Sequence, residues 1–190
     1  METLRTLTER ISINNLDHPV PSDDELETVY QAALRAPDHG RLTPWLFITV
    51  RPEERELLGK IFRESLETVD SGVTKGELEK WENKPMKAPM IIISIARIKD
   101  HPTIPASDMV LSAAAATQNM SLALFDMGYS TYWRTGEMRD NDALKKVLGL
   151  QKRDVIVGFL YIGTPQDSYK TIPDRESEDY FVSLSEVLYK

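Results

Sequence analysis

The sequence predicts an α+β fold, because helices and strands alternate without the regular strand–helix repeat of a parallel α/β protein. Two observations carry this prediction. Runs of aromatic and β-branched residues predict strands at 45–50 and 155–162. Longer segments with apolar residues three or four positions apart predict helices around them. The chain has 190 residues, and we expect a single domain over 1–190.

Three helices are predicted in the first part of the chain. Leu4, Leu7 and Ile11 lie on one face of a helix over 2–11. The second helix begins at an S-x-x-E capping box, in which a serine and a glutamate satisfy each other's backbone N–H groups, and it ends before a proline. These residues are Ser22, Glu25 and Pro37. A charged amphipathic helix follows at 52–69.

Residues 70–88 are polar and contain two glycines and a proline, so we expect a mobile excursion or lid there. The helix expected at 107–127 is apolar almost all round, which places it in a core or between subunits. The remaining elements are expected at 89–96 (a strand buried on both faces), 129–133 (a strand), 141–149 (a short helix that Asn141 caps) and 180–182 (an edge strand).

The composition excludes several classes of function. The chain has no cysteine, which excludes disulfides, thiolate metal sites, iron–sulfur clusters and thiol nucleophiles. Its net charge of −7 argues against a nucleic-acid partner or an acidic membrane surface. The three histidines, His18, His39 and His101, lie far apart, so no metal site is expected. Nothing resembles a targeting segment or a membrane span, and a cytoplasmic protein is the expectation.

Polar residues near the start of the chain form a first candidate cluster. Arg10 and Ser12 are two positions apart, and in extended backbone a guanidinium and a hydroxyl at this spacing can both reach one phosphate. A surface arginine beside a turn serine explains the same letters. Arg35 and His39 lie between a helix end and a strand, where polar groups often face a ligand, although a simple turn explains them equally well.

Trp133, Arg134 and Thr135 form a further cluster after a predicted strand. An aromatic ring, a guanidinium and a hydroxyl on one loop can stack on a planar ring and hydrogen-bond to it. Packing and surface roles remain the alternative.

Taken in order, these clusters resemble the nitroreductase family of FMN-dependent oxidoreductases, in particular its minimal, single-domain subgroup of NAD(P)H nitroreductases. The matching pieces cover nearly the whole chain. They are Arg10-Ile11-Ser12, Arg35 to His39 with Pro44-Trp45, Lys87-Ala88-Pro89, Trp133 to Gly136, and Val157 to Pro165.

The resemblance implies a nitroreductase-like fold, with a central mixed, mostly antiparallel sheet flanked by helices. It also implies an intertwined homodimer with FMN at the subunit interface and NAD(P)H as co-substrate. The cofactor-binding residues it implies are Arg10, Ile11 and Ser12 at the phosphate and ribityl end, Arg35 and His39 from the other subunit, and Trp133, Arg134 and Thr135 by the isoalloxazine. In the subgroup the stretch 123–128 is assigned to the nicotinamide nucleotide.

The function implied is an FMN-dependent NAD(P)H oxidoreductase with a ping-pong reaction. NAD(P)H delivers a hydride to flavin N5 and leaves, and a nitroaromatic, a quinone or a similar small acceptor then takes the electrons. The flavin supplies this chemistry, so no catalytic side chain is expected. Two alternatives stay open: a non-catalytic dimeric protein that binds or scavenges flavin, and a structural dimer with a vestigial site. Two departures from the family pattern favour the second: Ile11 stands where the subgroup usually has arginine, and Thr43 stands where glutamine commonly precedes Pro-Trp.

Overall fold

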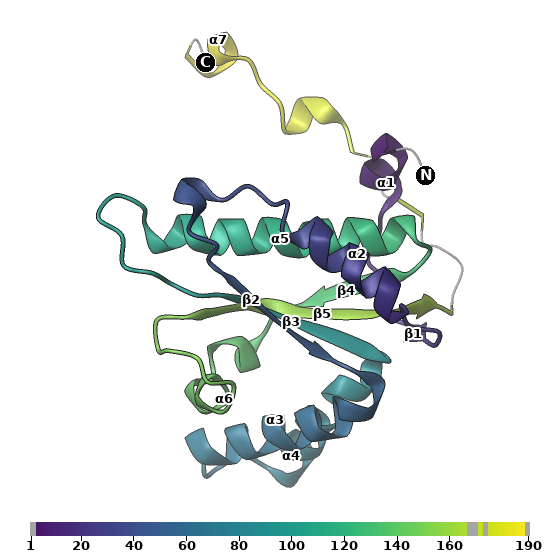
Figure 1. Ribbon diagram of the computed structural model, residues 1–190, viewed down its shortest axis with the longest axis vertical. Helices are drawn as coiled ribbons and strands as arrows, with labels where there is room; N and C mark the ends of the chain where they lie inside the picture. Colours follow the sequence, from purple (N-terminus) through teal and green to yellow (C-terminus); the bar gives the residue numbers. More distant parts are fainter. Residues whose placement is uncertain (1–2, 167–170, 173–174, 189–190) are drawn as a thin grey trace.

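The computed structural model describes residues 3–166, 171–172 and 175–188. A five-stranded sheet lies between two layers of helices (Figure 1). The helices are α1 (Thr3–Glu9), α2 (Asp23–Ala33), α3 (Arg55–Val69), α4 (Lys75–Glu82), α5 (Ala106–Asp126), α6 (Asp142–Val147) and α7 (Leu184–Leu188). The strands are β1 (Leu16–Asp17), β2 (Trp45–Val50), β3 (Met90–Ala96), β4 (Ser130–Arg134) and β5 (Val155–Pro165). Short 3-10 helices are η1 (His39–Arg41), η2 (Pro52–Glu54), η3 (Lys84–Lys87), η4 (Glu137–Asp140) and η5 (Ser177–Asp179).

The sheet is built around β5, which pairs with β1, β3 and β4, while β2 pairs with β3. Each of these pairings is antiparallel. A parallel bridge between Ser12 and Thr131 adds the segment after α1 to the outer edge of β4. The predicted α+β fold with a mixed, mostly antiparallel sheet is therefore confirmed.

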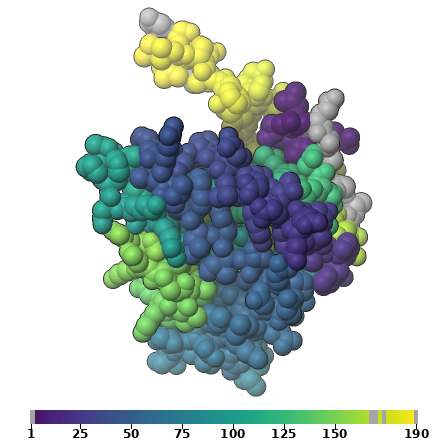
Figure 2. All heavy atoms as spheres, in the orientation of Figure 1, coloured from purple at the N-terminus to yellow at the C-terminus, as the bar shows by residue number. Residues whose placement is uncertain are grey.

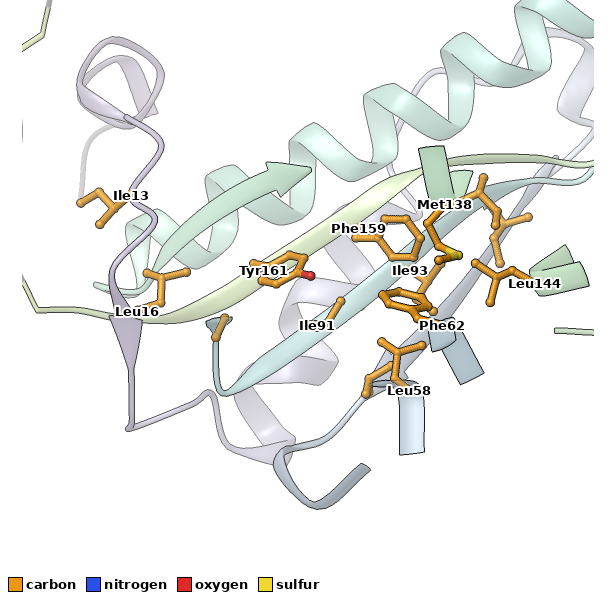
Figure 3. Close-up of a cluster of buried hydrophobic side chains, with 14 residues drawn as sticks. Ile13, Leu16, Leu58, Phe62, Ile91, Ile93, Met138, Leu144, Phe159 and Tyr161 are labelled. Carbon is orange, nitrogen blue, oxygen red and sulfur yellow. The ribbon is translucent and has the colours of Figure 1, made fainter. Parts of the chain in front are cut away.

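Strand β3 is buried on both faces, as its unbroken apolar run predicts. Side chains alternate between the two faces of a strand. Ile91 and Ile93 point toward α3, where they meet Phe62 in one cluster (Figure 3). Ile92 points the other way and packs with residues of α2 and α5 in a second cluster, which includes Leu124. We call these two sides of the sheet the α3 face and the α5 face.

The helix starts agree with the local signals in the sequence. Ser22 caps α2: its side chain accepts a hydrogen bond from the Glu25 N–H, and the Glu25 carboxylate accepts one from the Ser22 N–H at 2.8 Å. Asn141 caps α6 by accepting from the Leu144 N–H at 2.8 Å. Each cap satisfies a backbone donor that the helix itself leaves unpaired.

Residues 70–88 contain α4 and η3, and α4 packs on α3. Thr74 and Glu77 form a second capping box at the start of α4. The Trp81 ring packs edge-on against Phe62, with 6.2 Å between the ring centroids. The segment thus has helical structure of its own, and its role as a lid stays a prediction.

The edge strand predicted at 180–182 is wrong. Residues 180–182 form a turn and an irregular segment between η5 and α7, and this C-terminal arm (177–188) extends away from the sheet (Figures 1 and 2). A strand needs a partner for its backbone groups, and within the described ranges no sheet edge lies beside the arm. Its apolar side chains are exposed, led by Phe181 at 81%; the others are Tyr180, Val182, Leu184, Val187 and Leu188.

Gly158 lies in β5 where no side chain fits. A Cβ built there would come 2.2 Å from Trp133 Nε1 and 2.8 Å from the Arg134 carbonyl oxygen. We therefore expect Gly158→Ala to lower the free energy of unfolding by about 1–3 kcal/mol, as overpacking does. Gly76→Ala is the control, because space is open around Gly76 on α4 and alanine favours helix. Urea unfolding curves measure both, and unchanged stability of Gly158→Ala would contradict the steric argument.

Candidate functional site

A cationic group lies over two tyrosine rings on the α3 face of the sheet. The Arg134 guanidinium carbon is 4.5 Å from the Tyr132 ring centroid and 5.1 Å from that of Tyr161. Arg134 Nε is buried and has no hydrogen-bond partner among the described residues. A buried guanidinium nitrogen without a partner is costly, so this arrangement favours an acceptor supplied by a ligand.

A second cation lies beside Arg134. Lys84, in η3, places its ammonium 4.6 Å from the Trp81 ring centroid, and its carbonyl accepts a hydrogen bond from the Tyr161 hydroxyl at 3.2 Å. Burial and the nearby positive charge of Arg134 lower the pKa of Lys84, against a weaker opposite effect of Glu137. Burial raises the pKa of Tyr161 to about 12, so this tyrosine stays a neutral donor. Lys84 and Arg134 therefore both lie at Tyr161, and neither forms an ion pair with a carboxylate of the described residues.

The segment after α1 runs along the same strand. Ile13 N–H donates to the Thr131 carbonyl at 3.1 Å, which fixes Ser12 beside the start of β4. From Thr131 to Arg134 the strand advances about 10 Å. Arg10 is half-buried and forms no ion pair with any described residue. The ribityl chain of a flavin nucleotide separates its phosphate from its ring by a comparable length.

Ile11 contributes to hydrophobic packing and not to a charged site. It is half-buried and packs against the hydrophobic cluster on the α3 face, as Ile13 does two positions later. An arginine side chain could not pack there in the same way. The charge that the subgroup usually has at this position is absent, and positive charge comes instead from Arg134 at the end of β4 and from Lys84 in η3.

Arg35 and His39 lie on the other side of the molecule, against α5. Arg35 follows α2 and lines a pocket of about 410 Å³ with Asn119 and Ala123 of α5. His39 Nδ1 is 3.0 Å from the Asp108 carboxylate in the first turn of α5, and its side chain is 63% exposed. Within one chain the structure therefore does not bring Arg35 and His39 to Arg134.

Trp133 also points away from Arg134. Neighbouring residues on a strand face opposite sides, and Trp133 packs against the clusters on the α5 face. Its Nε1 is buried beside Gly158 and has no hydrogen-bond partner among the described residues. Thr135 is exposed just after β4. The predicted contact of one ring with both the Trp133 and Arg134 side chains is not available within one chain.

The stretch 123–128 is mainly packed. Leu124 is fully buried, Phe125 is nearly so, and Gly128 follows the end of α5. Asp126 accepts a hydrogen bond from Thr6 Oγ1 at 3.0 Å. Its assignment to the nicotinamide nucleotide stays a prediction.

Three residues of this site were missed from the sequence: Lys84, Tyr132 and Tyr161. The alternation of β5 places Tyr161 on the same face as Phe159, so that signal was present. Lys84 had no comparable signal, because it lies in the polar stretch expected to be a lid.

No group of three or more histidine or acidic residues within the described ranges is placed to hold a metal ion. None of the helices in those ranges is both long and apolar enough to cross a membrane.

The pKa of Lys84 should rise when the charge of Arg134 is removed. We expect Arg134→Gln to raise the pKa of Lys84 toward that of an ordinary lysine, measured by NMR titration of labelled lysine side chains. The pKa of Lys84 is lowered in the folded state. In the pH window between this pKa and the higher pKa of the unfolded chain, the unfolded chain therefore binds more protons at Lys84. This lysine therefore costs stability at low pH, and the cost disappears as pH rises through the window. Arg139→Gln is the control, and an unmoved Lys84 titration in Arg134→Gln would contradict the proximity of the two cations.

Comparisons with known proteins agree with this architecture. Residues 7–164 match the model of the nitroreductase family. The Escherichia coli K12 protein named "Putative NAD(P)H nitroreductase YdjA" is 31% identical over 177 residues, covering 92% of this chain and 96% of that protein. A Bacillus cereus nitroreductase-like family protein has a TM-score of 0.81 at 21% identity, with 97% of each chain covered. A Bacteroides fragilis nitroreductase with bound FMN has a TM-score of 0.71 at 17% identity, covering 96% of this chain and 99% of that one. This chain belongs to the nitroreductase family.

Proposed function

We propose that this protein is an FMN-dependent NAD(P)H oxidoreductase that passes electrons to a small acceptor such as a nitroaromatic or a quinone. The observation that carries the proposal is the Arg134 guanidinium, which lies over the Tyr132 and Tyr161 rings on the α3 face with Nε buried and unpaired among the described residues. Lys84 adds a second cation at Tyr161, whose hydroxyl donates to the Lys84 carbonyl. A buried guanidinium nitrogen without a partner among the described residues suits an anionic ligand. The relative named as an NAD(P)H nitroreductase and the neighbour with bound FMN support the same choice.

The residues present fit FMN. Arg10 and Ser12 would donate hydrogen bonds to the phosphate, at the start of β4. Arg134 and Lys84 would stabilise negative charge at the N1 and O2 edge of the reduced ring. When bound, FMN accepts a hydride at N5 from NAD(P)H and gives the electrons to the acceptor. The protein's part is to bind and orient the two ends of the cofactor and to supply positive charge.

We infer that the working unit is a homodimer in which the second copy completes each site. Arg35 and His39 cannot reach Arg134 in their own chain, since the sheet and its helices lie between them. Brought by a second copy, they would supply the positive group and the imidazole that the family resemblance assigns to the flavin. The C-terminal arm supports pairing, because a projecting segment with exposed Phe181 and Leu184 has a surface suited to burial against another chain.

We also propose that residues 1–190 form a single domain, as expected from the sequence. A cytoplasmic location, where NAD(P)H pools supply the reducing equivalents, is also proposed. Two alternatives would give different results. A flavin-binding protein without turnover would bind FMN without bleaching by NAD(P)H, and a structural dimer with a vestigial site would not bind FMN.

Arg10→Ala should weaken FMN binding. The variant removes a donor to the phosphate, so we expect the dissociation constant to rise about tenfold to a hundredfold, as for loss of a charge-assisted contact. Arg5→Ala is the control, because Arg5 lies on the adjacent helix and pairs with Glu9. Flavin fluorescence quenching gives the affinities, and anaerobic NAD(P)H bleaching of the bound flavin tests turnover. A wild-type protein that stays colourless with FMN would sink the proposal, and binding without bleaching would favour a flavin-binding protein.

Mixing two defective variants should restore some sites if each site uses both copies. In a hybrid dimer of Arg10→Ala and Arg35→Ala, one site carries both changes and the other carries neither. After unfolding and refolding an equal mixture, we expect about a quarter of all sites to bind FMN tightly, given a two-fold symmetric dimer with random pairing. Titration at an FMN concentration that saturates only intact sites measures this fraction. Absence of tight sites in the mixture would place Arg10 and Arg35 in the same chain's site or in none.

A further inference from the structure

The loop between α2 and β2 holds an unusual backbone conformation. Arg41 has φ 54° and Thr43 has φ 44°, although neither is glycine. A β-branched residue with positive φ is a genuine outlier, because its side chain crowds the backbone. Gly40 has φ 72°, a conformation that glycine adopts readily. Strained backbone of this kind persists only where surrounding contacts hold it.

The Asp38 side chain holds this loop through two backbone hydrogen bonds. The Asp38 carboxylate accepts hydrogen bonds from the Leu42 N–H at 3.1 Å and from the Thr43 N–H at 2.6 Å. The Asp38 carbonyl accepts a third from the Arg41 N–H at 3.2 Å. The Lys99 ammonium donates to the Leu42 carbonyl, which fixes the loop from outside. Asp38 is half-buried and forms no ion pair with a described residue, so its charge is directed to the backbone.

The bracing serves side chains that point outward. Arg41 and His39 are both exposed, and Arg41 has no ion-pair partner among the described residues. A loop that needed only to connect α2 to β2 could use ordinary turn conformations without strain. Retained strain beside an exposed cation indicates that the position of the cation matters.

We propose that Asp38 is a positioning residue, whose carboxylate holds loop 39–43 with Arg41 and Thr43 at positive φ and so presents His39 and Arg41 to the anionic flavin nucleotide bound by a second copy of the chain. This inference rests on the proposed function, since it assigns the loop to the FMN site across the dimer. It adds two groups to that site, the bracing carboxylate of Asp38 and the guanidinium of Arg41.

The first test removes the brace. Asp38→Ala loses both backbone hydrogen bonds, so the loop should relax and the FMN dissociation constant should rise about tenfold. Asp38→Asn keeps one acceptor oxygen and should fall between Asp38→Ala and the wild type. Asp70→Ala is the matched control: Asp70 accepts a similar bond from the Gly72 N–H at 2.8 Å in another loop, and its loss should leave FMN affinity unchanged.

The second test distinguishes positioning from general stability. Glycine adopts positive φ without strain, so Thr43→Gly in the Asp38→Ala background should lower the demand for bracing and bring FMN affinity back to within about threefold of the wild type. A purely structural Asp38 would change the melting temperature of the FMN-free dimer and leave FMN affinity unchanged. Size-exclusion chromatography and circular dichroism confirm that each variant is a folded dimer.

The outcomes separate this inference from the proposed function. Failure of the wild-type protein to bind FMN overturns both. Normal wild-type binding with unchanged affinity in Asp38→Ala and Asp38→Asn overturns the positioning role and leaves the proposed function intact. Weakened binding in Asp38→Ala that Thr43→Gly does not recover also counts against it, because the loss would not then come from the loop's conformation. If Asp38→Ala does not fold, Asp38→Asn with and without Thr43→Gly gives the same comparison.

Discussion

Strand β5 is the constraint on which the architecture depends. It pairs directly with β1, β3 and β4, and β2 joins through β3, so the register of every strand is fixed relative to β5. A strand that is buried on both faces cannot slip by one residue, because a slip would exchange its two sets of side chains. With that register, Phe159 and Tyr161 face α3, and β4 lays Tyr132 and Arg134 on the same side. The cationic site follows from the strand pairing.

The same alternation divides the candidate site. The sheet places Arg134 on one face, while Arg35 and His39 lie against α5 on the other. A small ligand cannot cross a buried sheet, so Arg35 and His39 of one chain cannot meet a ligand held by Arg134 of the same chain. The exposed arm and the outward residues of α1 and α5, including Leu4 and Leu111, are surfaces that a second chain would cover. The proposed homodimer would bury these surfaces and complete the proposed site together.

Much of the fold could be predicted because its signals are local and strong. The apolar run of β3, the Ser22–Glu25 box and the Asn141 cap each match an element in the structure. The site was harder for a definable reason. The predicted strand ended at Trp133, which placed Arg134 in a loop with it, but β4 continues through Arg134 and so turns the two side chains to opposite faces.

Other groups could not be predicted since their meaning depends on distant residues. Lys84 gains its role only because η3 brings it to Arg134, and Asp38 only because the loop after it folds back onto its carboxylate. The arm at 177–188 carries an apolar pattern that a strand could also show, and local sequence does not say whether a sheet edge is within reach. Contacts of long sequence separation are where propensity and spacing stop being informative.

The contact between Trp133 and Gly158 couples two positions on neighbouring strands. The indole occupies the space that a side chain at 158 would need, and its Nε1 reaches to where that Cβ would be. A relative with a larger residue at 158 must therefore have a smaller one at 133 and a shifted strand as well, because the Arg134 carbonyl oxygen lies 2.8 Å from the same Cβ. Variation at the two positions should be correlated across the family, and a single exchange at either would be selected against even though neither side chain carries charge or chemistry.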